Sequence, residues 1–243
     1  MLICLSGCSS ITSDSDRAIA LVIEGLPERS IEEGDTLTLL ADVVTAAGDT
    51  VPDPAIVWTI VDPDTGQLGF TLDSLTGLVT GTKPGGGRVR PRFEDLITLA
   101  VVTVTVTPAP DSLAAAGDQR VALQTSDSIS APMVAAVFDR TTDSSAVVAL
   151  EDKQVQFYLI SPPPGSTDAS GFYLTLSDNG QPGEDPHRVT VKTDQQGQAR
   201  AVVKRHPGAV LTDSAVVEAA VVTAVGGPVA GSPVRFVVLF GTS

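Results

Sequence analysis

Side chains that could perform acid–base or nucleophilic chemistry are few in this chain. It contains two histidines, His187 and His206, and two cysteines, Cys4 and Cys8. No serine or cysteine stands in the glycine-flanked pattern of a nucleophile elbow. No cysteine follows Cys8, so the remainder of the chain builds neither a cysteine–histidine pair nor a cysteine-type metal site. The pattern predicts a protein that is not an enzyme.

Two other kinds of site need only residues that this chain contains, namely a glycosidase site and a phosphate-binding loop. A glycosidase needs only two carboxylates and the chain has 29 acidic residues, but aromatic residues make up only 4% of it, which disfavours an aromatic-lined cleft. Lys83 precedes the run Gly85 to Gly87, whereas the lysine of a phosphate-binding loop follows its glycines. We therefore interpret these glycines as structural and expect no cofactor other than a candidate calcium ion.

One loop gathers the oxygen ligands that calcium prefers. Asp178-Asn179-Gly180 is followed by Glu184 and Asp185, and Asp62 and Asp64 form a second, smaller cluster. Neither spacing matches an EF-hand, and an ordinary Asp/Asn/Gly surface turn is the alternative for both. The candidate metal ligands are Asp178, Asn179, Glu184 and Asp185.

The start of the chain has an aliphatic residue, two small residues and a cysteine in succession. This segment, Leu5-Ser6-Gly7-Cys8, resembles the bacterial lipobox. The resemblance implies cleavage before Cys8, lipidation of Cys8, and a polar tether behind it. Ser9, in place of aspartate, then points to the outer membrane in a Gram-negative cell.

The resemblance departs from the lipobox pattern in one respect. Only seven residues precede Cys8 and none is basic, whereas a signal peptide begins with positive charge and an apolar stretch. We interpret residues 1–7 as a signal-peptide remnant, with the true start upstream or lost by truncation, and residues 8–18 as the lipidated tether. A chance tetrad of small residues on a frayed end is the alternative, and a secreted protein is the alternative location.

Composition limits the class of protein and its partners. The chain is 42% hydrophobic with few aromatics, so its cores must consist of valine, leucine, isoleucine and alanine, and its valine and threonine favour strands. A net charge of −14 disfavours nucleic acid and anionic lipid. No stretch reaches the roughly 18 apolar residues of a membrane span. Partners are therefore expected to be proteins or cell-surface polymers, with membrane attachment through the lipid anchor alone.

Residues 19–107 have the short alternating strands and frequent turns of a β-sandwich. Thr36 to Val44 alternates as one strand, and Ile56 to Ile60 places Trp58 at the centre of the core. Gly77 and Gly81 are expected at turns with positive φ, and Gly85 to Gly87 at a sharp turn. The order of turn and core residues resembles the bacterial immunoglobulin-like group 2 domain, which occurs in surface proteins and adhesins. The resemblance is carried by Glu33 to Thr36, Gly48 to Val51, Val57 to Thr59, Leu75 to Gly81 and Val102 to Val106.

Residues 108–117 form a predicted linker, stiffened by prolines, in which Asp111 to Gly117 is expected to make one helical turn. Residues 118–243 are predicted to form a second sandwich. Its turn Thr193 to Gly197 and its strand around Val155 to Phe157 resemble the group 1 domains of invasin-like adhesins, with two loop insertions. The predicted strands are Arg120 to Thr125, Pro132 to Asp139, Gln154 to Ile160, Gly171 to Ser177, Arg188 to Asp194, Gln198 to Lys204, Ala215 to Thr223 and Val234 to Phe240.

The predicted fold class is therefore all-β, with two immunoglobulin-like sandwiches in tandem. The expected function is that of a non-enzymatic lipoprotein of the cell envelope that acts as a surface spacer, adhesion or protein-interaction module. A carbohydrate- or polymer-binding module and a subunit of an envelope assembly are the alternatives. Because loops carry recognition in such folds, the candidate partner-binding residues are Pro162, Pro163, Pro164, Phe172 and Tyr173.

Overall fold

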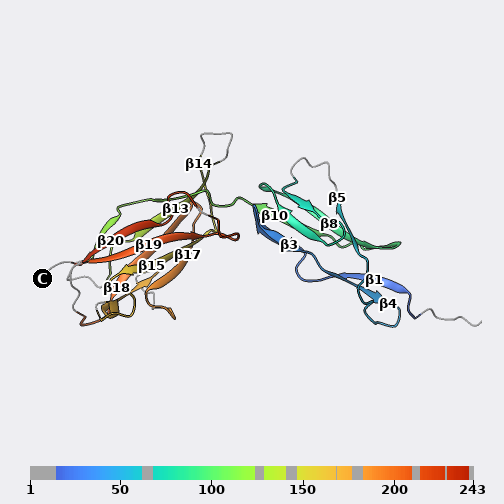
Figure 1. Ribbon diagram of the computed structural model, residues 1–243, viewed down its shortest axis with the longest axis horizontal. Coiled ribbons are helices and arrows are strands. Elements are labelled where there is room, and N and C mark those ends of the chain that lie inside the picture. Colours follow the sequence, from blue (N-terminus) through green and yellow to red (C-terminus); the bar gives the residue numbers. More distant parts are fainter. Residues whose placement is uncertain are drawn as a thin grey trace, which may run out of the picture. The chain divides into compact units, whose positions relative to one another are not determined.

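The regular secondary structure of the computed structural model, over the residues that it describes, is almost entirely β-strand (Figure 1). It describes residues 15–61, 68–123, 129–140, 147–167, 169–176, 183–209, 214–227 and 229–240. The chain divides between Thr107 and Pro108 into two compact units, which we call unit 1 and unit 2. Within the described residues, no helix has the length and apolar character needed to cross a membrane. Each unit is an immunoglobulin-like β-sandwich, as the sequence predicted.

The described part of unit 1 forms three sheets. One has the strand order β2-β10-β8-β5, with β9 added to β8, and the others are the pair β1-β4 and the set β3-β7-β6. The early strand β2 runs parallel to the last strand β10, and the other pairs are antiparallel. The strands are β1 (Ala18–Ile23), β2 (Glu28–Glu32), β3 (Thr36–Thr38), β4 (Ala41–Thr45), β5 (Val57–Val61), β6 (Phe70–Leu72), β7 (Leu78–Gly81), β8 (Gly85–Phe93), β9 (Leu96–Ile97) and β10 (Val102–Thr107).

The segment Thr36 to Val44 is not the single strand that its alternation predicted. It breaks after β3, because the backbone N–H of Leu39 donates to Gly77 at 2.9 Å while the carbonyl of Leu40 accepts from Glu24 at 3.0 Å. Consecutive residues thus bond to two different sheets. The inward side of the pattern is nevertheless confirmed, since Leu39 and Val43 are buried.

The glycines of unit 1 serve close packing as much as turns. Gly77 has a φ of +70°, as expected for a turn, but Gly81 lies within β7 and has no positive φ. Gly85 to Gly87 form the start of β8, so the prediction of a sharp turn there was wrong. A Cβ on Gly87 would lie 3.0 Å from the ring of Phe70, which explains the need for glycine within this strand.

The core of unit 1 is aliphatic, with one tryptophan and one phenylalanine. Trp58 is buried in it, as predicted, and partly buried neighbours such as Ile56 and Ile60 pack against the same cluster. Burial of each large side chain contributes about 1.5–3 kcal/mol. The buried members are Ile31, Leu39, Trp58, Phe70, Val79, Val89, Val102, Val104 and Val106.

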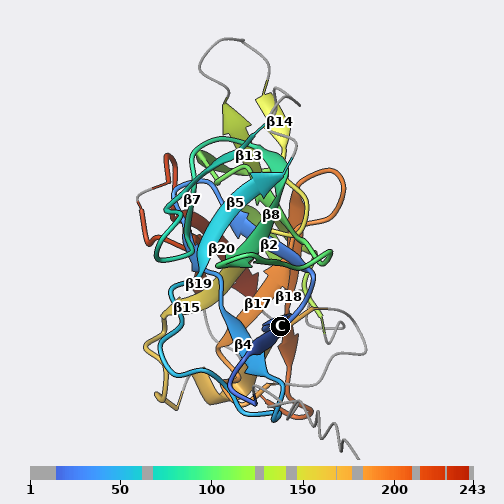
Figure 2. The ribbon, with the colours of Figure 1, turned by 90° about the vertical axis from the view of Figure 1, so that its right-hand side faces the viewer.

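Unit 2 is a sandwich of two larger sheets. One has the order β11-β13-β18-β16 and the other β12-β20-β19-β15-β17. β14 pairs with β13 beside the first sheet, as Figure 2 shows. The elements are β11 (Ser112–Ala115), β12 (Arg120–Leu123), β13 (Met133–Arg140), β14 (Val147–Ala149), β15 (Gln154–Ser161), the 3-10 helix η2 (Ala169–Gly171), β16 (Phe172–Thr175), β17 (Arg188–Lys192), β18 (Gln198–Arg205), β19 (Ser214–Val222) and β20 (Val234–Phe240).

The eight strands predicted for unit 2 are present, with ends that differ by a few residues. The helical turn expected over Asp111 to Gly117 is wrong. Ser112–Ala115 is instead the strand β11, which pairs antiparallel with β13 and buries Leu113 in the core. A tertiary partner overrides the local signals of a cap and a glycine stop.

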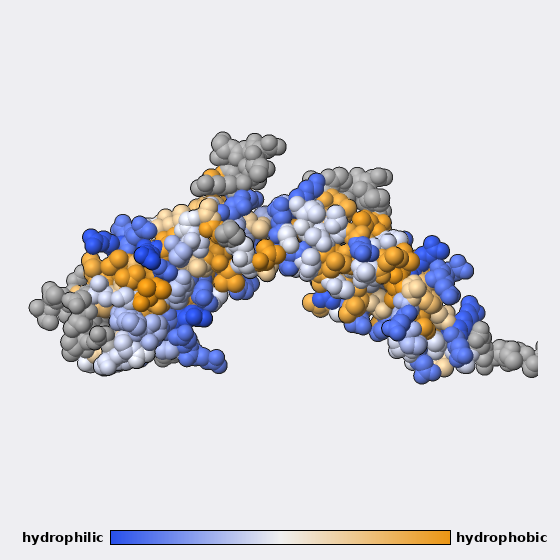
Figure 3. Space-filling view, in the orientation of Figure 1, coloured by the Kyte–Doolittle hydropathy of each residue, from blue (hydrophilic) through white to orange (hydrophobic). Residues whose placement is uncertain are grey.

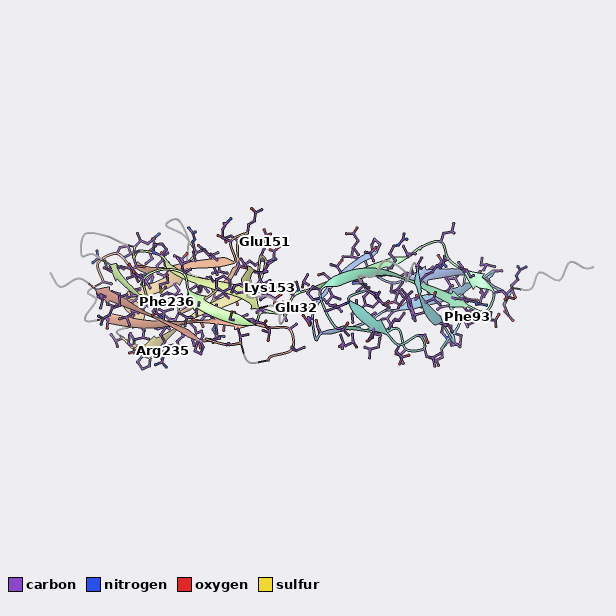
Figure 4. All side chains as sticks on the ribbon, turned by 90° about the horizontal axis from the view of Figure 1, so that it is seen from above. Glu32, Phe93, Glu151, Lys153, Arg235 and Phe236 are labelled. Carbon is purple, nitrogen blue, oxygen red and sulfur yellow. The ribbon has the colours of Figure 1, made fainter. Side chains whose placement is uncertain are left out.

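Side chains in unit 2 alternate between core and surface. Arg235 and Phe236 are successive residues of β20, and Figure 4 shows them leaving the strand on different sides. Phe236 is fully buried, with its ring centroid 6.2 Å from that of Phe157 on β15. This alternation gives the sheet one apolar face toward the core and one outward face free for recognition.

Candidate binding surface

A row of polar side chains crosses the outward face of the sheet β12-β20-β19-β15-β17. The antiparallel register places Arg188 of β17 beside Tyr158 of β15. It then places Tyr158 beside Glu218 of β19, and Glu218 beside Arg235 of β20. Because directly paired residues project from the same face, the four side chains lie together on the outside of the sheet. We call these four residues the polar row.

Hydrogen bonds fix the centre of the polar row. The hydroxyl of Tyr158 donates to Oε2 of Glu218 at 2.9 Å, and Nε of Arg235 donates to Oε1 at 2.6 Å. The side chain of Glu218 is only 8% exposed, whereas that of Arg235 is 71% exposed. Both oxygens of the carboxylate therefore have a donor although the group is almost buried.

The ionisation of these groups follows from the hydrogen bonds. The Arg235 guanidinium holds the pKa of Glu218 below its usual value, and the Tyr158 hydroxyl acts in the same direction against the effect of burial. Burial, together with the neighbouring Glu218, raises the pKa of Tyr158. A carboxylate that is ionised and already bound by two donors is a weak general base. The polar row is thus suited to recognition and not to proton transfer.

A hollow of about 410 Å³ adjoins the polar row. It is lined by Tyr158 and Arg188 of the row, by Gln156 and Ala220 of the two central strands, and by Gly226 in the turn after β19. Its volume falls within the range of about 300–1,000 Å³ that is common for ligand pockets. Amide, phenol and guanidinium groups give it both donors and acceptors for a polar partner.

Apolar side chains occupy the outward face beside the polar row. Val216 of β19 pairs with Val237 of β20, and Leu239, farther along β20, is 41% exposed. Ile160 is also 41% exposed where the β15–β19 ladder becomes irregular. Figure 3 shows hydrophobic surface over the part of unit 2 where β19 and β20 lie. The face thus joins an apolar patch to charged groups, as protein-binding surfaces do.

Unit 1 has a hollow of its own, of about 510 Å³. It is lined by Asp16, Glu94 and Asp95 together with Arg17 and the ring of Phe93. Figure 4 places Phe93 on unit 1. The described part of the chain brings no group of three or more potential metal ligands together, here or in unit 2.

The two aromatic residues predicted to bind a partner are buried. Phe172 and Tyr173 of β16 are 1% and 6% exposed, so their rings are not available for stacking on a ligand, and this part of the prediction was wrong. Phe172 belongs to the core of unit 2. All four residues of β16 are buried, and the ring centroid of Phe172 lies 5.3 Å from that of Phe240 in the core, so this strand has no exposed side that alternation would predict.

The predicted proline loop does reach the surface. Pro163 and Pro164 are exposed and Pro162 is partly buried, in the connection between β15 and η2. The backbone N–H of Ser166 donates to Pro163 at 3.1 Å, which closes the loop as a turn. A role of this loop in partner binding stays a prediction.

Both histidines have structural environments. His187 Nε2 lies 2.8 Å from the carbonyl oxygen of Ala169, and its ring makes an edge contact with Phe172. The ring of His206 lies 4.9 Å from that of Tyr173, measured between centroids. The histidines thus pack against the aromatic residues of β16 and the loop before it.

The other predicted site residues fall partly outside the described residues. This is the case for Cys8 and residues 8–14 of the predicted tether, and for Asp178 and Asn179 of the candidate calcium loop, whereas residues 15–18 of the tether are described and Ala18 begins β1. Glu184 and Asp185 are exposed. Asp185 accepts a hydrogen bond from the backbone N–H of His187 at 2.9 Å and lies 3.8 Å from Arg188. Lipidation and calcium binding both stay predictions.

Local sequence patterns place the residues of the polar row on strands but do not reveal their contact. Glu218 is the single acid within an otherwise apolar strand, and Tyr158 alternates with the inward residues Phe157 and Leu159. Both positions could be assigned to strands. Their contact depends on the register between β15 and β19, which no local pattern specifies.

Comparisons with solved structures return bacterial surface proteins, and also human protocadherin-24, at low similarity. The Yersinia pseudotuberculosis adhesin InvE is 14% identical with a TM-score of 0.37, and the match covers 92% of this chain and 58% of InvE. The Escherichia coli adhesin FdeC is 12% identical with a TM-score of 0.43, over 94% of this chain and 65% of FdeC. Domains 4 and 5 of the S-layer protein SbsC are 12% identical with a TM-score of 0.32, over 93% of this chain and 99% of that structure.

This chain spans less than two thirds of the InvE and FdeC structures. No family model matches its sequence, and no curated protein is significantly similar to it. At this level of similarity, function has to be argued from the residues of the chain itself.

Proposed function

We propose that this chain is a non-enzymatic lipoprotein of the bacterial cell envelope, in which two immunoglobulin-like sandwiches act as a spacer and as a protein-interaction module. The observation that carries the interaction role is the outward face of unit 2. There a fixed polar row, a hollow and an apolar patch lie together on one rigid sheet. A surface on rigid strands loses little conformational entropy when it binds.

The lipid anchor is proposed from the segment Leu5 to Cys8, and the outer membrane from Ser9. Fractionation of native cells tests it directly. The wild-type chain should partition with membranes, and Cys8→Ala should move it to the soluble fraction. Cys4→Ala is the matched control and should leave the partition unchanged. A wild-type chain found in the soluble fraction would contradict the anchor.

The interaction role is tested by a charge change on the outward face of unit 2. Arg188→Glu should weaken binding of the full chain to envelope proteins immobilised from the same cells, whereas Arg200→Glu, on an exposed position of β18, should not. Equal binding by both variants and the wild type would show that the partner does not bind at this face.

The alternative of a carbohydrate-binding module predicts binding on a glycan array. The burial of Phe172 and Tyr173 reduces the aromatic surface that such a module would use.

A further inference from the structure

The edge strand β17 of unit 2 has backbone groups that face away from its sheet. Within the described residues, it pairs with β15 alone. Leu159 donates to the carbonyl of His187 and Thr193 donates to that of Lys153, so odd-numbered residues of β17 bond to β15. In an antiparallel ladder the intervening residues turn their N–H and C=O groups to the other side. Thr190 and Lys192 therefore present hydrogen-bonding groups along an open edge.

The edge strand β2 of unit 1 has the same property. Thr103 donates to the carbonyl of Pro27 and Glu33 donates to that of Thr107, so odd-numbered residues of β2 bond to β10. The even-numbered residues Glu28 and Ser30 turn their backbone groups outward. The strand closes at Glu32, whose carbonyl already accepts a hydrogen bond from Asp35 at 3.0 Å.

The side chains along these two edges are complementary. β2 reads Glu-Arg-Ser-Ile-Glu and β17 reads Arg-Val-Thr-Val-Lys. The residues whose backbone faces the open edge have opposite charges at the same spacing. In β2 they are the acids Glu28 and Glu32 on either side of Ser30. In β17 they are the basic residues Arg188 and Lys192 on either side of Thr190. The side chains of Glu28, Ser30, Arg188, Thr190 and Lys192 are all exposed.

We infer that copies of this chain associate head to tail, with β2 of one copy adding as an antiparallel strand to β17 of the next. Ser30 lies opposite Thr190 in this pairing, which brings Glu28 opposite Lys192. Backbone hydrogen bonds supply the attraction, and the oppositely charged pair sets the register. Antiparallel addition is favoured because its ladder is the more stable one per residue.

The same charges disfavour pairing between two identical edges. An antiparallel β17–β17 contact centred on Thr190 would set Arg188 against Lys192, and a β2–β2 contact would set Glu28 against Glu32. Like charges directly opposite each other are destabilising, and charged residues on edge strands are a common protection against such association. Unit 2 of one copy therefore pairs with unit 1 of the next copy, and not with another unit 2.

Existing ion pairs do not block the contact. Lys192 lies 3.5 Å from Asp152 and Arg188 lies 3.8 Å from Asp185, with all four side chains more than half exposed. Exposed pairs of this kind contribute about 0–1 kcal/mol and exchange readily. The contact joins two different surfaces, so each bound copy still offers an unpaired edge to a further copy, and repeated addition gives a ring or an open chain of copies according to the rotation between neighbours. Such an assembly would form whether the protein is anchored or secreted.

Sedimentation velocity of the full chain over a concentration series, at low and at high salt, tests this inference. Association should rise with concentration and weaken with salt, because the charged pair is exposed. Lys192→Glu and Glu28→Lys should each lower the association constant about tenfold at low salt, and the double variant should restore it. Arg200→Glu is the control and should behave as wild type. A chain that stays monomeric throughout the series, or single variants that associate as wild type does, would overturn the inference.

Disulfide trapping provides a second measurement with specific geometry. In a Cys4→Ser, Cys8→Ser background, chains with Ser30→Cys are mixed with chains that carry Thr190→Cys. Opposed residues of a hydrogen-bonded antiparallel pair have Cα atoms about 5.5 Å apart, which suits a disulfide. Only the mixture should form covalent dimers on oxidation. Equal dimer formation by either variant alone would refute the pairing of β2 with β17.

Discussion

Replacement of Arg235 by methionine tests whether the polar row stabilises unit 2. Arg235→Met keeps most of the aliphatic stem and removes the guanidinium that donates to Glu218 at 2.6 Å. The carboxylate, 8% exposed, would keep a single donor, the hydroxyl of Tyr158. We therefore expect unit 2 to become less stable without a change in its fold.

The magnitude follows from the exposure of the two partners. Removal of one member of a fully buried ion pair costs about 3–5 kcal/mol, whereas a fully exposed pair contributes about 0–1 kcal/mol. Here the acid is buried but Arg235 is 71% exposed, so water can reach the side of the carboxylate that loses its donor. We expect a loss of about 1–2 kcal/mol, in line with a hydrogen bond to a charged group.

The pH dependence has a definite sign. Arg235 lowers the pKa of Glu218 in the folded protein, so the pair contributes stability above the ordinary carboxylate pKa, and this contribution is lost as pH falls through the lowered value. The difference between wild type and Arg235→Met should therefore be largest at neutral pH. It should shrink in strongly acidic solution, where Glu218 is protonated in both proteins.

The chain contains its own probes for this measurement. Its one tryptophan, Trp58, lies in unit 1, and its two tyrosines, Tyr158 and Tyr173, lie in unit 2. Urea unfolding followed by tyrosine fluorescence should show the loss, while tryptophan fluorescence should stay unchanged. Arg200→Met, at an exposed position of β18, should stay within about 0.5 kcal/mol of wild type. A loss in Arg235→Met no larger than in this control would refute the reasoning.

Three further outcomes are expected. Gly197→Ala should lower the free energy of unfolding by about 2–4 kcal/mol in the same urea assay, because the φ of Gly197 is +71° and an added Cβ would lie 2.8 Å from the carbonyl oxygen of Val137. Gly226→Ala is the control: its φ of +66° is similar but the space around it is open, so it should lose only about 1 kcal/mol. Burial and the neighbouring Asp111 raise the pKa of Asp139, so ionisation of this carboxyl destabilises the folded state as pH rises. Asp139→Asn removes that ionisation and should therefore raise the melting midpoint at neutral pH, by an amount that disappears at acidic pH. EDTA should lower the melting midpoint of unit 2 if the predicted loop binds calcium, and an unchanged midpoint would remove that site.

The sequence predicted the strands of unit 2 most clearly where they have a period of two. Gln154–Ser161 and Gln198–Arg205 alternate between polar and apolar residues, which a strand requires when only one of its faces is buried. β11 was missed, since Ser112–Ala115 is short and lies between residues typical of a helix cap and a glycine stop. Its pairing with β13 decides its conformation, and that partner is remote in sequence.

The glycines of β8 show a different limit of sequence reasoning. Gly85 to Gly87 read locally as a turn, because glycine is the residue that turns most often require. In the structure Gly86 pairs with Thr105 and Gly87 with Val104, and the absence of a Cβ at Gly87 makes room for the ring of Phe70. Glycine carries the same local signal for conformational freedom and for close packing, so only the neighbour in space distinguishes them.

The features proposed to carry function share one property, which is that they exist only between strands. Tyr158, Glu218 and Arg235 lie on three strands and become a bonded group through the register of the sheet. The complementarity of β2 and β17 likewise depends on which residues face the open edge, and this follows from their hydrogen bonds to β10 and β15. A pattern of period two identifies the exposed face of a strand but not its neighbours, and a one-residue slip would exchange the two faces. Binding surfaces built on sheets are therefore specified by pairing, whereas a long strand with one buried face can be recognised from its own pattern.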